Sequence, residues 1–153
     1  MNKYRVEQIF EYLSKTIEPK SDLEYSSNFE LLIAVILSAQ ATDVGVNKVT
    51  RVLFSVANTP QKILDLGYDK FEELIKRIGL YRSKARNIFK TCKILIDEYG
   101  GEIPRTRDEL QSLHGVGRKT ANVVLNIAFG ELTIAVDTHV FRVSNRMGLV
   151  SSK

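Results

Sequence analysis

Residues 113–121 read Leu113-His114-Gly115-Val116-Gly117-Arg118-Lys119-Thr120-Ala121. Two glycines flank a valine, so the backbone can turn tightly between one helix and the next. Apolar residues recur at helical spacing on both sides, which favours helices at about 106–113 and 118–129. The stretch therefore predicts a helix-hairpin-helix motif, at about 106–129, within an all-α fold.

The turn is also a candidate anion site. No side chain blocks the backbone at Gly115 or Gly117, so amides of the turn, with Val116 between them, can point at an anion together with the start of the next helix. A DNA phosphate suits that geometry and requires no particular base sequence. An ordinary helix–helix connection explains Gly-Val-Gly equally well, and the turn alone leaves both interpretations open.

Two cations follow the turn. Arg118 and Lys119 lie in the predicted first helical turn, where the macrodipole favours anions and each misplaced charge costs about 0.3–1 kcal/mol. Cations at an unfavourable helix position point to a function, and we predict that Arg118 binds a DNA phosphate. Thr120, in the same helical turn, is a further predicted DNA-binding residue. Lys119 is the predicted nucleophile, because nearby positive charge and partial burial favour a neutral amine that can attack a sugar C1′, expel a base and form a Schiff base.

Such chemistry needs a negative group to stabilise the cationic sugar or to help deprotonate the amine. Asp137 follows the apolar run 134–136 and is the predicted catalytic carboxylate. Taken alone, it is better explained as the N-cap of a helix that begins at Thr138. One carboxylate can serve both purposes.

Helical periodicity extends over the rest of the chain, and no segment sustains strand-like alternation. Capping boxes are predicted at Ser27 with Glu30 and at Thr106 with Glu109, and Asp69 is predicted to open a helix. The helix at 28–39 is apolar on every side and should lie at the centre of the bundle. We predict helices at about 3–17, 28–39, 43–57, 60–66, 70–78, 83–99, 106–113, 118–129 and 138–147.

The charge balance mildly favours a polyanionic partner, since 22 Lys and Arg face 18 Asp and Glu for a net charge of +4. Seven cations follow one another with no acidic residue between them: Lys76, Arg77, Arg82, Lys84, Arg86, Lys90 and Lys93. A basic run of this kind either covers phosphates or forms a solvated helix face, and the solvated face is the commoner case.

Cys92 is the only cysteine, so this chain alone forms no disulfide and no four-cysteine iron–sulfur or metal site. Its apolar neighbours predict a core position. The chain starts without the apolar run of a signal peptide, and the longest apolar stretch, 29–39, is too short to span a bilayer. We therefore expect a cytoplasmic protein that does not contact a membrane.

These residues resemble the endonuclease III family within the helix-hairpin-helix DNA glycosylases. The resemblance covers essentially the whole chain, with long ungapped motifs at 29–43, 78–81, 113–126 and 136–142. It implies that Lys119 is the Schiff-base lysine and Asp137 the catalytic aspartate. It also implies that Gln40 and Leu80 fill the gap left by a flipped-out nucleotide. Without it, Gln40 could equally well cap its helix, and Leu80 could fold back on the core.

By this resemblance, the partner is double-stranded DNA that carries damaged bases or abasic sites. The chain is expected to act as a monomer, nucleoid-associated if bacterial, that excises oxidised or damaged pyrimidines and nicks the abasic site by β-elimination. No diffusible cofactor or catalytic metal is implied. The expected architecture is a six-helix lobe at 21–131 and a second lobe made from 1–20 and 132–153.

The chain departs from the family in two respects. Family members continue through further helices whose four cysteines hold a [4Fe–4S] cluster, so we expect a shortened member with an incomplete second lobe. The alternative function is a remnant that grips DNA through its hairpin but does not turn over. In addition, His114 stands where the family usually has proline, a change that should be tolerated.

Overall fold

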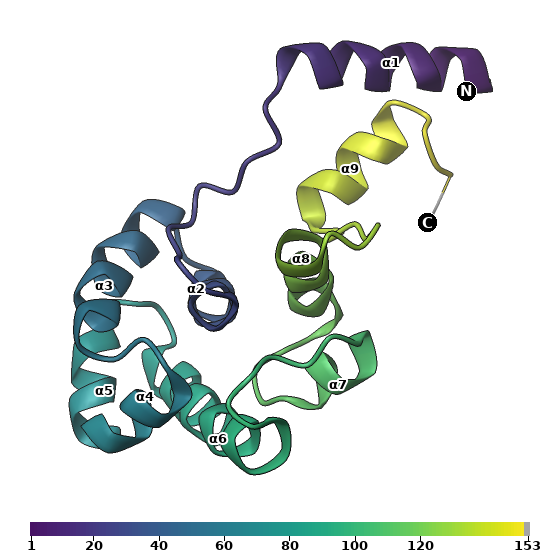
Figure 1. Ribbon diagram of the computed structural model, residues 1–153. Coiled ribbons are helices and arrows are strands. Elements are labelled where there is room, and N and C mark those ends of the chain that lie inside the picture. The colour runs from purple at the N-terminus through teal and green to yellow at the C-terminus, as the bar shows by residue number, and fades with distance from the viewer. Residues whose placement is uncertain (152–153) are drawn as a thin grey trace. The chain divides into compact units, whose positions relative to one another are not determined.

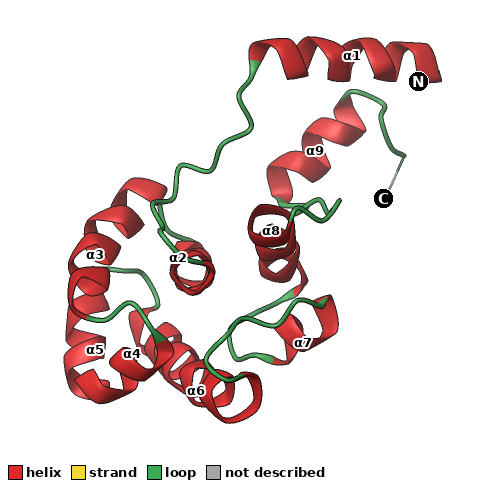
Figure 2. Cartoon of the chain, viewed as in Figure 1, coloured by secondary structure: helices red, strands yellow, loops and turns green. Residues whose placement is uncertain are grey.

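The computed structural model describes residues 1–151, and every regular element in that range is a helix (Figures 1 and 2). The all-α prediction is confirmed. The helices are α1 (Lys3–Thr16), α2 (Asn28–Ser38), α3 (Asp43–Val56), α4 (Pro60–Leu66), α5 (Tyr68–Ile75), α6 (Tyr81–Tyr99), α7 (Arg107–Ser112), α8 (Arg118–Phe129) and α9 (Thr138–Arg146). None of them is long and apolar enough to cross a membrane.

The chain divides into two compact units, Asp22–Ala135 and Met1–Ser21 with Val136–Lys153. The larger unit contains α2 to α8, and the smaller one contains α1 and α9. The structure places residues 132–135 with the larger unit rather than with the second lobe. Asn122 explains this placement, because its carbonyl accepts from Thr133 Oγ1 at 2.6 Å and its Nδ2 donates to the Ile134 carbonyl at 3.3 Å.

Helix α2 is the core of the larger unit. All of its residues from Phe29 to Leu37 are buried, and it lies between α3 and α8 (Figure 1). Each fully buried leucine or isoleucine contributes roughly 1.5–3 kcal/mol relative to an exposed position. The prediction that this helix occupies the centre of the bundle is confirmed.

The start of α2 follows the predicted capping box, with one change. Ser27 Oγ accepts a hydrogen bond from the Glu30 amide at 3.1 Å, whereas Glu30 Oε2 reaches back to the Ser26 amide at 2.5 Å. The buried Glu30 carboxylate therefore also holds the segment that enters the helix. Both bonds use amides that would otherwise lack a helical acceptor.

Helix α5 begins two residues and ends three residues before the predicted bounds of about 70–78. Gly67 has φ 88°, and it is both the last residue of the α4 turn and the N-cap of α5, so α5 begins at Tyr68 before Asp69. Glycine reaches this left-handed backbone without a Cβ penalty, which lets the second helix start at once. Beyond Ile75 the chain forms a tighter turn, in which the Ile78 amide bonds to the Ile75 carbonyl at 2.9 Å.

Cys92 lies in the core of the larger unit, as predicted. Burial raises the pKa of its thiol to about 12, so the thiol stays protonated and unreactive at neutral pH. The [4Fe–4S] cluster implied by the family resemblance needs four cysteine thiolates. One inward-facing protonated thiol does not fit that requirement, and the residues of this chain do not form the cluster site.

Candidate nucleic-acid interface

The turn between α7 and α8 is anchored in the core by Leu113 and Val116. Both side chains are buried, and the Val116 amide donates to the Leu113 carbonyl at 3.3 Å. The amide of Val116 is therefore already engaged within the turn. Gly115 and Gly117, by contrast, are exposed on either side of it.

Helix α8 begins with open amides. The Ala121 amide makes the first helical bond, to the Gly117 carbonyl at 2.9 Å, so the amides of residues 118–120 have no helical acceptor. Gly117 has no side chain that could cap them, whereas Thr106 caps the preceding helix through its hydroxyl. Open amides at a positive helix end favour an anion such as phosphate.

Arg118 and Lys119 add two exposed cations to this helix end. The expected partial burial of Lys119 was wrong. The face of α8 that packs on the core carries Ala121, Val124 and Leu125, and residue 119 lies on the opposite side of a helix with 3.6 residues per turn. The Lys119 amine is therefore accessible to a substrate without any rearrangement of α8.

Helix α6 contacts the turn through two of its side chains. The buried Thr91 Oγ1 donates to the His114 carbonyl at 3.0 Å, and Asn87 lies against Gly115. The role of Thr91 was not predicted from the sequence. A hydroxyl at a core position of an otherwise apolar helix face is a signal that could have identified it, because a buried hydroxyl requires a hydrogen-bond partner.

The two glycines of the turn differ in what they require. Gly115 has φ 80°, and a Cβ added there would lie 3.0 Å from Asn87 Cβ, whereas one at Gly117 would meet nothing within 4 Å. We expect Gly115→Ala to destabilise the larger unit by about 1–3 kcal/mol, the cost of a strained left-handed residue. Gly117→Ala is the matched control and should leave the melting temperature nearly unchanged. Equal melting temperatures for the two variants would contradict this account.

Gln40 and Leu80 are the only non-glycine residues within 1–151 that have positive φ, at 56° and 59°. The structure brings their connections together, since a Cβ on Gly79 would lie 3.8 Å from the Gln40 carbonyl. Leu80 is 61% exposed, so the alternative in which it folds back on the core was wrong. Left-handed backbone at a residue with a side chain costs about 1–3 kcal/mol and concentrates at functional sites.

Lys84 neither lies on a solvated helix face nor is exposed to cover phosphates, the two interpretations offered for the basic run. It is 5% exposed, and its ammonium donates to the carbonyls of Leu37 at 2.9 Å and Ala39 at 2.6 Å. Burial lowers the pKa of Lys84 from its usual range. The other six cations of the run are exposed: Lys76, Arg77, Arg82, Arg86, Lys90 and Lys93.

Asp137 belongs to the smaller unit, whereas Lys119 belongs to the larger one. Its Oδ1 accepts from the Val140 amide at 2.7 Å, which confirms the predicted N-cap of α9. Its Oδ2 lies 3.9 Å from His139 Nδ1, and the carboxylate side chain remains 37% exposed. The capping bond thus orients a carboxylate that is still accessible.

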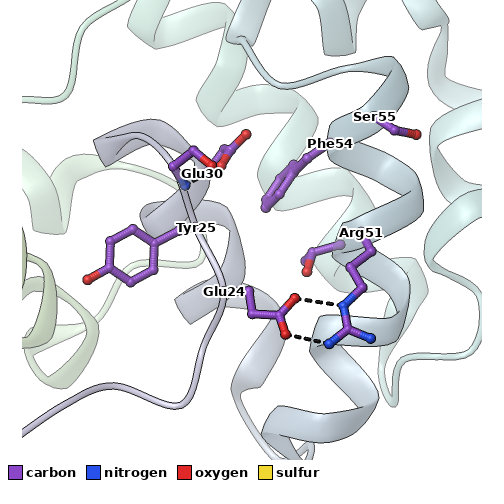
Figure 3. A pocket seen from close by; sticks show the side chains of 8 residues that line it. Glu24, Tyr25, Glu30, Arg51, Phe54 and Ser55 are labelled. Atoms are coloured by element: carbon purple, nitrogen blue, oxygen red, sulfur yellow. Dashed lines mark hydrogen bonds and ion pairs between the residues drawn. The ribbon is translucent and has the colours of Figure 1, made fainter.

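A separate pocket of about 280 Å³ lies between the segment before α2 and helix α3. In it the guanidinium of Arg51 makes two hydrogen bonds to the Glu24 carboxylate, and the Phe54 ring lines the same pocket (Figure 3). The Arg51 bonds hold the pKa of Glu24 below its usual range. None of the predicted site residues lines this pocket, and we assign the pair a structural role in joining the segment to α3.

Comparison with known proteins identifies close relatives over the full length of the chain. It is 60% identical to Endonuclease III of Haemophilus influenzae and 56% identical to Endonuclease III of Escherichia coli strain K12. Both alignments cover 100% of this chain and 73% of the relative.

Solved structures agree with the sequence relatives. A non-covalent Endonuclease III–DNA complex matches with a TM-score of 0.92 at 51% identity, covering 99% of this chain and 71% of that one. A thermostable thymine-DNA glycosylase matches with a TM-score of 0.81 at 28% identity, and the match covers 94% of this chain and 66% of that glycosylase. The sequence model described as HhH-GPD superfamily base excision DNA repair protein matches residues 33–153. The chain therefore belongs to the HhH-GPD superfamily of base excision DNA repair proteins.

Proposed function

We propose that this chain is a bifunctional DNA glycosylase and abasic-site lyase of base-excision repair. Its substrate is double-stranded DNA that contains oxidised or damaged pyrimidines or abasic sites, and it acts as a monomer. The observation that carries the proposal is the exposed Lys119 in the open first turn of α8, in a chain that matches Endonuclease III along its whole length. Its proposed location is the cytoplasm, or the nucleoid of a bacterium, where the substrate DNA lies.

The hairpin grips the backbone of the DNA in this proposal. A phosphate accepts from the open amides of α8, and Arg118 neutralises its charge. Gly115 and Gly117 allow close approach of the duplex, and Thr120 adds a hydroxyl in the same helical turn. These contacts fix the register of the DNA without reading its sequence.

Gln40 and Leu80 act on the base stack. A nucleotide that leaves the duplex creates a gap, and the Gln40 amide and the exposed Leu80 side chain, which come from two neighbouring connections, can fill it with polar and apolar contacts. Unstacking a damaged or mismatched base costs less than unstacking a paired one, which contributes to selectivity.

Lys119 supplies the covalent chemistry. Its neutral amine attacks the sugar C1′, the base leaves with the electrons of the glycosidic bond, and ring opening gives a Schiff base. Loss of a C2′ proton then expels the 3′ phosphate and breaks the strand. The Asp137 carboxylate stabilises the cationic sugar or helps to deprotonate the amine.

Borohydride trapping tests the proposal directly, because borohydride reduces a Schiff base to a stable amine. The purified chain is incubated with a duplex containing one thymine glycol and, in parallel, with a matched abasic-site duplex. Covalent adducts on both duplexes are expected. An adduct on the abasic duplex alone would remove the glycosylase step, and no adduct from folded, DNA-binding protein would favour the remnant binding module.

A further inference from the structure

We propose that Lys84 is a positioning residue for nucleotide extrusion, because it joins the two left-handed connections that present Gln40 and Leu80 to DNA. This inference rests on the proposed function, in which those two side chains fill the gap. Lys84 itself is buried, so we place it among the residues that support the site rather than among those that touch DNA. Its effect is transmitted through the backbone on either side of it.

The first link runs from the Lys84 side chain to the end of α2. The last carbonyls of a helix lack helical partners and carry partial negative charge. Lys84 Nζ satisfies two such carbonyls, those of Leu37 and Ala39, and Ala39 immediately precedes Gln40. A buried ammonium is costly unless it is hydrogen-bonded, so these two contacts define where the chain leaves α2.

The second link runs from the Lys84 backbone to the start of α6. Its amide donates to the Leu80 carbonyl at 3.1 Å, which is the first helical bond after the left-handed residue. A single residue is therefore bonded to both connections. The short separation between the Gly79 position and the Gln40 carbonyl is consistent with this double attachment.

Positive φ at Gln40 and Leu80 stays populated only while the surroundings hold it there. Loss of the ammonium would leave the Leu37 and Ala39 carbonyls without their donor and allow residues 39–41 to relax. The close spacing of the connections that carry Gln40 and Leu80 would then be lost. Functional groups need placement within about 0.5 Å, so a small relaxation is enough to impair extrusion.

The test uses Lys84→Met, which keeps an unbranched side chain one atom shorter than lysine but removes its donors, with exposed Lys90→Met on the same helix as control. The duplex carries 2-aminopurine beside a thymine glycol, so its fluorescence reports unstacking independently of chemistry. We expect Lys84→Met to lower the fluorescence rise and slow base excision about 10- to 100-fold, the loss typical of a misplaced group. Borohydride trapping on a single-stranded abasic oligonucleotide, which needs no extrusion, should stay at the wild-type level.

A double-mutant cycle separates positioning from general stability. In a Gln40→Ala background, Lys84→Met should cause little additional loss of base unstacking, because the side chain that Lys84 positions is already absent. Lys84→Gln keeps two donor hydrogens and should be intermediate, and it replaces the Met variant if that variant does not fold. Unstacking equal to wild type in Lys84→Met, or an additive loss in the Gln40→Ala background, would overturn the inference. Loss of trapping by the wild-type chain would instead count against the proposed function.

Discussion

Lys119→Ala is expected to abolish strand nicking and the borohydride adduct while largely sparing DNA binding. Removal of a nucleophile eliminates the covalent path altogether, and losses of at least about 10⁴-fold are typical of such variants. The side chain is exposed on the face of α8 away from the core, so its truncation should not disturb the fold. Single-turnover nicking of an abasic duplex and gel-shift binding are measured on the same preparation.

Arg118→Ala is the matched control, because it removes the neighbouring cation from the same helical turn. It should weaken binding and reduce the steepness of log affinity against log salt concentration by about one unit, as expected for the loss of one phosphate contact. The adduct should still form when the DNA is saturating. A Lys119→Ala protein that continued to trap on DNA would show that another amine is the nucleophile.

Asp137→Asn is expected to slow base release by about 10²- to 10⁴-fold, the range typical of general acid–base groups. Asparagine caps helices as well as aspartate does, so the hydrogen bond from the Val140 amide survives the change. The change thus removes the negative charge while it keeps an acceptor for the capping bond. Single-turnover excision from the thymine glycol duplex measures the rate, and DNA affinity should change much less.

Comparison of Asp137→Ala with Asp137→Asn separates the effect of the cap from that of the charge. The alanine variant loses both, and the loss of the cap costs about 0.5–2 kcal/mol of stability. Thermal unfolding should therefore show Asp137→Ala below Asp137→Asn, while the two excise bases equally slowly. An unchanged excision rate in Asp137→Asn would leave this carboxylate with a capping role only.

Features that depend on neighbours along the chain could be predicted from the sequence. The caps by Ser27, Thr106 and Asp137 all accept a hydrogen bond from the amide three residues later. The uniformly apolar character of α2 predicted its central position, because a helix that is apolar on every face must be buried on every face. The hairpin was recognisable because glycine spacing is a local property of the backbone.

Features that depend on distant residues could not be predicted. Lys84 read as one cation in a basic run, but its ammonium bonds to carbonyls 47 and 45 residues earlier in the chain. The adjacency of Gln40 and Gly79, and the contact of Thr91 with His114, arise in the same way. Charge and periodicity do not indicate which face of α6 meets the end of α2.

The sequence by itself determined the all-helical class, the hairpin and its two cations, and the residues that resemble a glycosylase site. These follow from helical periodicity, capping and glycine conformation, which act over a few residues. Only the tertiary structure decided that Lys119 is exposed, that Val116 is core, and that Lys84 bonds to the end of α2. Burial and long-range hydrogen bonds depend on packing between helices, because a side chain is desolvated only by residues that the fold brings to it.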